Sequence, residues 1–232
     1  MNDFNEPPND PVGTVGLFPL PNLVLFPQAL QPLHIFEPRY REMTADALAG
    51  DRQIALVLLQ PGWEKTYEKM PLIYTVACLG RIVADHLLED GRSNLLLRGI
   101  SRVRILEELP QTKLYREARV EVITDLCTAT LDTVMDLRRQ LEAKIVPRFE
   151  DGPVIKQLAE LFHSEMSLGA LCDVLTFALP VPIEWKQMML EERDEEVRAG
   201  MLMEGFDMIA GTKVAIVGGN ESRKFPPDFS PN

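Results

Sequence analysis

The sequence predicts an α+β protein in which a strand-rich first half is followed by a helical second half. Up to about Asp125, short apolar runs are separated by glycine, proline and aspartate, as in a sheet with tight turns. After Asp125, apolar residues recur every three or four positions, which is typical of amphipathic helices. We therefore expect a β-rich subdomain over residues 14–125 and a helical subdomain over 126–211, between a flexible N-terminus (1–13) and a largely flexible tail (212–232).

The first apolar stretch begins at Leu17 and is interrupted by Pro19, Pro21 and Pro27. Each proline fixes one backbone angle and removes an amide donor. The pieces between the prolines are therefore expected to be short strands near sheet edges, or turns.

A short helix is expected next, starting near Pro38, because Tyr40, Met43 and Ala47 recur at helical spacing and proline suits a first helical turn. The compact apolar run 54–59 then has the length of a buried strand.

A β-hairpin is predicted around Asp90-Gly91, because this dipeptide lies between the apolar stretches 76–88 and 94–97. The runs 103–106 and 119–123 add two further strand candidates, which completes a first half rich in strands.

The second half predicts a small bundle of helices. Ser167 and Asp194 are expected N-caps, and Pro182 suits the first turn of a helix. The apolar residues expected on the inner faces are Val134, Leu137, Leu141 and Ile145, then Ile155, Leu158, Leu161 and Phe162, then Leu168, Leu171, Leu175 and Ala178, and finally Val197, Met201, Phe206 and Ile209.

Three ordered blocks of the sequence resemble the LON domain, the N-terminal substrate-recognition domain of Lon proteases, which also occurs within cereblon. The blocks run from Phe18 to Met43, from Gly80 to Ile105 and from Leu171 to Glu191, and the similarity covers roughly residues 14 to 210. The resemblance implies a PUA-like β pseudo-barrel followed by a helical bundle. It also implies binding of polypeptide substrates.

Composition excludes several other classes of protein. A net charge of -11 works against binding nucleic acid through its phosphates. The N-terminus lacks the basic and apolar parts of a signal peptide, and no apolar run approaches the ~20 residues of a membrane span. Cys78, Cys127 and Cys172 are widely spaced, so we expect small buried residues and neither disulfides nor a metal site. These features predict a cytoplasmic protein.

The groups required for the chemistry of a complete Lon protease are missing. The sequence has no Gly-Lys dipeptide and thus no phosphate-binding P-loop, and the LON-like region leaves no room for a Ser-Lys protease domain. Ser93 and Ser101 lack the GxSxG context of a nucleophile and are assigned to hairpin turns. We therefore predict a non-enzyme without a cofactor. A hydrolase whose site forms only in three dimensions, from His34, His86 or His163, is the alternative.

Exposed apolar residues then become the candidates for binding. Trp63, Tyr67 and Met70 lie in a charged loop between two predicted strands, and Met188 and Met189 lie in the helical half. The competing interpretations are that Trp63 folds back over the barrel and that the methionines fill the helical core. Four residues of the opening block are assigned to the barrel core: Phe18, Leu25, Phe26 and Phe36.

The function that combines these observations is a non-catalytic polypeptide-binding module, an adaptor or scaffold in protein quality control. Its expected partners are unfolded or flexible polypeptides and a protease or chaperone that receives them. A second alternative is RNA binding through a basic patch of Arg81, Arg102 and Arg104, since Arg102 and Arg104 alternate onto one face of a strand. The sequence leaves the oligomeric state open.

Overall fold

A computed structural model describes residues 12–65, 70–149 and 153–208 of the chain. It divides into two compact units between Ile123 and Thr124, and each unit is described by itself. Within the described ranges, no helix is long and apolar enough to cross a membrane.

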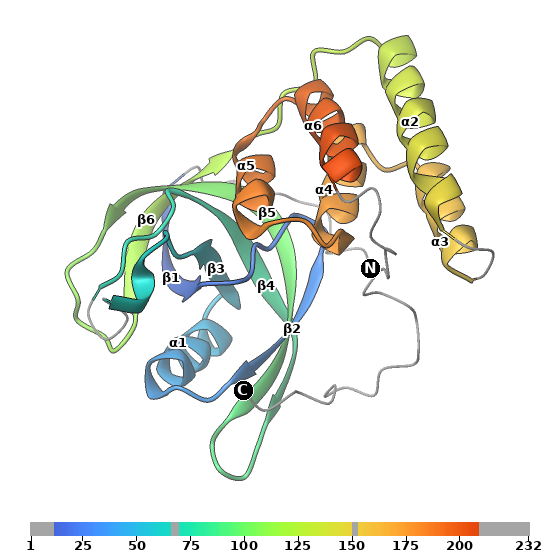
Figure 1. Ribbon diagram of the computed structural model, residues 1–232. Helices are drawn as coiled ribbons and strands as arrows, with labels where there is room; N and C mark the ends of the chain where they lie inside the picture. Colours follow the sequence, from blue (N-terminus) through green and yellow to red (C-terminus); the bar gives the residue numbers. More distant parts are fainter. Residues whose placement is uncertain (1–11, 66–69, 150–152, 209–232) are drawn as a thin grey trace. The chain divides into compact units, whose positions relative to one another are not determined.

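The first unit is a six-stranded sheet in the order β2-β5-β4-β3-β1-β6 (Figure 1). An additional pairing of β5 with β6 closes strands β5, β4, β3, β1 and β6 on themselves, while β2 is paired with β5 alone. The strands are β1 (Val12–Leu20), β2 (Leu30–Ile35), β3 (Gln53–Leu58), β4 (Val76–Leu87), β5 (Ser93–Glu108) and β6 (Arg116–Ile123).

The proline-rich opening forms a longer and more central strand than predicted. β1 lies between β3 and β6, so the expectation of short pieces near sheet edges was wrong for this strand. Pro19 is tolerated because β1 pairs with β6 only as far as Leu17, whereas Pro19 is opposite Val57 of β3.

The other strand proline, Pro32, obeys the edge rule. It lies in β2 opposite Leu96. The Gly99 amide donates a hydrogen bond to the Ala29 carbonyl (2.9 Å). Hydrogen-bonded and non-hydrogen-bonded pairs alternate along an antiparallel ladder, so the nitrogen of Pro32, three residues after Ala29, faces away from β5. The missing donor therefore costs no hydrogen bond in the sheet.

β5 joins two segments that the sequence analysis treated separately. It runs from Ser93 through the 103–106 segment to Glu108 without a turn, so Ser101 lies inside a strand and its assignment to a hairpin turn was wrong. The predicted turn at Gly91 is confirmed, with φ of 79° between β4 and β5.

The core of the first unit includes most of the opening block. Phe18, Leu25 and Phe26 are buried as predicted, but Phe36 is 59% exposed, so its core assignment was wrong. Ile35 takes the inward position at the end of β2, and Phe36 turns outward to stack on the His34 ring at 6.1 Å. The imidazole of His34 is also bound to the Asn94 side chain at 2.7 Å, which is the structural role expected for it.

The predicted helix is confirmed as α1 (Pro38–Ala49), with proline in its first turn and with Tyr40 and Met43 buried. At its start, Arg39 pairs with Glu37, the residue before the helix, at 2.7 Å. A 3₁₀ turn, η1 (Trp63–Lys65), follows β3.

The second unit is helical. It contains α2 (Leu131–Ile145), η2 (Val146–Arg148), α3 (Pro153–Phe162), α4 (Leu168–Ala178), α5 (Ile183–Glu191) and α6 (Glu195–Met208).

The two predicted caps are confirmed. Ser167 accepts the Ala170 amide at the start of α4, and Asp194 accepts the amides of Glu196 and Val197 at the start of α6.

The inner face of α6 is rotated from the predicted one, because a buried arginine occupies part of it. Val197 is 47% exposed, whereas Ala199, Leu202 and Phe206 are buried. Arg198 is fully buried, and its guanidinium contacts Asp125 (2.6 Å) and Asp173 (3.3 Å). An apolar repeat cannot reveal a charged side chain that is buried by being paired.

Candidate functional site

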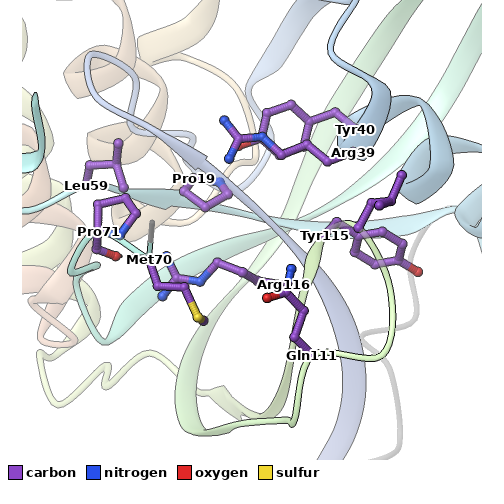
Figure 2. Close-up of a pocket in the computed structure, with 10 residues that line it drawn as sticks. Pro19, Arg39, Tyr40, Leu59, Met70, Pro71, Gln111, Tyr115 and Arg116 are labelled. Carbon is purple, nitrogen blue, oxygen red and sulfur yellow. Dashed lines mark hydrogen bonds between the residues drawn. The ribbon is translucent and has the colours of Figure 1, made fainter. Parts of the chain in front are cut away.

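A small hollow with an apolar rim lies on the first unit, beside the end of β1 (Figure 2). Its volume is about 40 Å³, which suits the end of one side chain and is far smaller than the pockets that hold whole small molecules. It is lined by Pro19, Arg39, Tyr40, Leu59, Met70, Pro71, Gln111, Leu114, Tyr115 and Arg116.

The floor of the hollow is built from buried residues that rigid elements hold in place. Pro19 is the second-last residue of β1, Leu59 follows β3, and Tyr40 lies in the first turn of α1. Tyr40 is 6% exposed, and its ring packs on Phe18 with centroids 4.4 Å apart. The floor is therefore preformed.

The rim carries apolar side chains that solvent reaches. Met70 is 50% exposed and Leu114 is 58% exposed, and both line the hollow. Leu72, two residues after Met70, is 72% exposed. Large apolar groups exposed together mark an interaction surface more often than an isolated one does.

Arg116 fixes one wall. Its guanidinium donates two hydrogen bonds to Glu108 (2.7 and 2.6 Å) and a third to the carbonyl of Pro71 (2.9 Å). This bidentate pair is strong and directional, and it holds the segment that carries Met70 against β6. Figure 2 shows Met70 and Arg116 on one side of Pro19, with Arg39 and Tyr40 on the other.

Tyr115 is anchored behind the hollow by a cluster of charged groups. Its hydroxyl donates to Asp46 of α1 (2.7 Å) and accepts from Lys113 (2.8 Å), whose ammonium also contacts Asp46 and Glu117, each at 3.0 Å. The hydrogen bond from Tyr115 and the contact with Lys113 lower the pKa of Asp46, while burial raises the pKa of Tyr115. The cluster joins α1 to the start of β6.

The described residues that line the hollow include no histidine, serine or cysteine. Its two arginines are both engaged in ion pairs. Across the part of the chain that the structure describes, no group of three metal-binding side chains occurs. The hollow is suited to holding an apolar side chain of a bound polypeptide, while the polar groups around the hollow face the backbone of that polypeptide.

The residues predicted for binding are not brought together. Met70 lines the hollow, while Trp63 is half-buried and packs against the core of the first unit, as the competing interpretation expected. Tyr67 lies outside the described residues. In the second unit Met188 is 55% exposed, but Met189 is fully buried, so placing Met189 on a binding surface was wrong.

Sequence reasoning missed Leu114 and Tyr115, which line the hollow together with Met70. The available signal was a leucine next to a tyrosine in a polar connection between two strands. In the 61–71 loop, large apolar side chains among charged ones were the signal that selected Met70.

The basic patch does not form. Arg102 is 2% exposed and is a core residue, so it cannot contribute to a surface for RNA. Arg104 is exposed but pairs with Glu121 on β6 at 3.3 Å, and Arg81 is half-buried. Because Arg102 is buried, the basic patch that the alternation of Arg102 and Arg104 along β5 suggested is not present on the surface.

The expectation of buried cysteines was wrong for one of the three. Cys78 and Cys172 are buried, but Cys127 is exposed. Glu195, the first residue of α6, is only 7% exposed. Its charge is the main cause that raises the pKa of the Cys127 thiol, which makes this thiol a poor nucleophile.

The three histidines are not gathered at the hollow. His34 and His86 lie in one row across the sheet, on either side of Asn94, while His163 follows α3 in the second unit. None of them lines the hollow.

Comparison with known proteins places the hollow within a recognised domain. A family model described as the ATP-dependent protease La (LON) substrate-binding domain matches residues 14–205. The chain is 31% identical to Lon protease 2 of Myxococcus xanthus over 191 residues and 28% identical to the Lon protease of Dictyoglomus thermophilum over 193 residues. These alignments cover 81% and 78% of this chain but 23% of each relative, so the chain spans about a quarter of their length.

Solved structures show the same fold. The N-terminal domain of a Mycobacterium avium complex Lon protease superposes with a TM-score of 0.66 at 16% identity, covering 84% of this chain and 98% of that one. A Lon N-terminal domain protein from Xanthomonas campestris gives 0.60 at 20% identity, with 83% and 98% covered. The α+β prediction is confirmed at this level.

Proposed function

The chain belongs to the ATP-dependent protease La (LON) substrate-binding domain family, and we propose that it binds unfolded or flexible polypeptides without cleaving them. The hollow between Met70 and Leu114 is the proposed contact surface. The PUA-like description of the closed strands, and a role as an adaptor or scaffold in quality control, belong to the same proposal.

One observation carries the proposal: exposed apolar side chains surround a preformed floor. Met70 and Leu114 offer adaptable apolar area, and methionine in particular fits side chains of different shape. Folded proteins bury their apolar side chains, whereas unfolded chains present them one at a time. A hollow of about 40 Å³ matches such single side chains.

The absence of cleavage is supported by what the family match covers. The matched region is the substrate-binding domain alone, and the rest of each Lon relative has no counterpart in the alignments. The cytoplasmic location and the protease or chaperone that would receive the bound polypeptide stay predictions.

Site-specific photo-cross-linking tests the location. Benzoylphenylalanine would replace Leu114 in one variant and Leu131 of α2, which is 74% exposed, in a control variant. With α-casein as an unfolded probe, we expect cross-links from position 114 and few from position 131. Equal yields from both positions would mean that the hollow is not the contact surface.

A further inference from the structure

A second depression on the first unit, on a different set of residues, has the features of a docking groove. Its volume is about 750 Å³, and it lies between α1 and the hairpin formed by β4 and β5. It is lined by Pro38, Arg41, Glu42, Thr44, Ala45, Leu48, Asp85, Leu87, Gly91 and Ser93. None of these residues lines the hollow.

The groove has apolar walls and one unsatisfied polar group. Leu87 of β4 is 69% exposed, and Leu48 of α1 is half-buried on the opposite side. Thr44 is 2% exposed, yet its hydroxyl has no hydrogen-bond partner among the described residues. A buried hydroxyl without a partner is costly, so an occupant whose carbonyl or amide displaces what covers this hydroxyl and binds it would be stabilised.

The rim offers a charge of each sign. Arg41 and Glu42 are adjacent, and neither forms an ion pair with any residue in the described ranges. Gly91 leaves room for Arg41, because a Cβ atom at this turn position would overlap the guanidinium as it lies here. Asp85, the other acid of the groove, is already paired with Arg52.

We propose that this groove binds the chain's own segment Arg223–Phe229, whose sequence is Arg-Lys-Phe-Pro-Pro-Asp-Phe. Phe225 and Phe229 match the apolar walls, Asp228 matches Arg41, and Lys224 matches Glu42. The two prolines favour an extended conformation that leaves backbone carbonyls free to accept a hydrogen bond from Thr44.

The segment belongs to a part of the chain that the family match does not cover, since that match ends at residue 205. Phe225 lies 17 residues after Met208, the last residue of α6. Seventeen extended residues can span about 55 Å. A tethered segment also has an effective concentration in the millimolar range, so a groove with few polar anchors is sufficient.

Hydrogen exchange of the full-length protein tests this inference. Amides of residues 38–49 and 84–93 should exchange about tenfold faster in Phe225→Ser/Phe229→Ser than in the wild type. The control Val214→Ser/Ile216→Ser changes apolar residues of the same region outside the segment, and it should behave as the wild type. Equal exchange in all three proteins, or protection that rises with protein concentration as for a second copy, would overturn the proposal.

Exchanging the charges at positions 41 and 228 tests the proposed pairing of these two side chains specifically. Arg41→Asp and Asp228→Arg should each speed exchange at these amides, and the double variant should restore most of the protection. Additive losses in the double variant would overturn the pairing of Arg41 with Asp228. Both readouts are independent of polypeptide binding at the hollow, so either proposal can fail without the other.

Discussion

The Nη1 atom of Arg198 lies 3.3 Å from Oδ1 of Asp173, and solvent reaches neither side chain to more than 1%. A second carboxylate, that of Asp125, contacts the same guanidinium at 2.6 Å. The pairing joins α4, α6 and the segment that opens the helical unit, and it explains why an arginine is found on a core face.

Replacing Arg198 by methionine should destabilise the helical unit strongly. The change leaves Asp173 buried and without its counterion, and breaking a buried pair in this way costs about 3–5 kcal/mol. Urea unfolding followed by far-UV circular dichroism measures the effect. Arg139→Met, at an exposed position on α2, is the matched control and should lie within about 0.5 kcal/mol of the wild type. Similar stabilities for the two variants would refute the structural role of the cluster.

Gly99→Ala should disrupt the long strand β5. A Cβ atom at this position would overlap the backbone carbonyl of Phe26, which cannot move as a flexible side chain could. We expect a loss of at least about 2 kcal/mol in the free energy of unfolding. Gly13→Ala is the control, because no atom lies within 4 Å of its Cβ position. Equal stability of both variants would show that the close approach is absent.

Asp46 should contribute to stability at neutral pH and lose this contribution in acid. Hydrogen bonds from Tyr115 and Lys113 hold its pKa below 3.8 in the folded state. The contribution is therefore complete above the unfolded pKa and disappears as pH falls through the folded pKa. Thermal unfolding of the wild type and Asp46→Asn from pH 2 to 7 should show a gap that closes below about pH 4. A gap that does not change with pH would argue against the cluster.

Lys186 should also make the folded protein more stable as pH rises, but in alkali and by the relief of a cost. Burial lowers its pKa from 10.5 to about 8, although its ammonium also donates to the Phe177 carbonyl at 2.8 Å. The unfolded state binds more protons between these two values, so the cost of burying Lys186 is present below about pH 8 and is relieved as pH rises. The stability of Lys186→Met relative to the wild type should therefore fall between pH 8 and 10.5. A constant difference over this range would contradict the assignment.

The sequence predicted the elements well where local signals decide them. The cap residues Ser167 and Asp194 and the turn at Gly91 are determined by bonds between near neighbours, and all three are confirmed. The position of Pro19 in the sheet was predicted wrongly. A proline is tolerated in β1 at this point because the pairing of β1 with β6 stops at Leu17, and where that pairing stops depends on residues far away in the sequence.

The candidate site was only partly predictable for a similar reason. Met70 was selected as an exposed apolar residue in a loop, but Leu114 is 44 positions away and reaches the hollow only through the closure of the sheet. Arg102 and Met189 were assigned to surfaces and are buried. Alternation and helical spacing identify which residues share a face, but they do not say which face is covered.

Affinity for an unfolded polypeptide tests the central claim most directly. Fluorescence anisotropy with labelled α-casein would compare the wild type, Met70→Asp/Leu114→Asp and the control Leu131→Asp. We predict that the double variant binds at least about tenfold more weakly, a loss of ~1.4 kcal/mol, while the control keeps the wild-type affinity. Equal binding by all three proteins, or no binding by the wild type, would contradict the account.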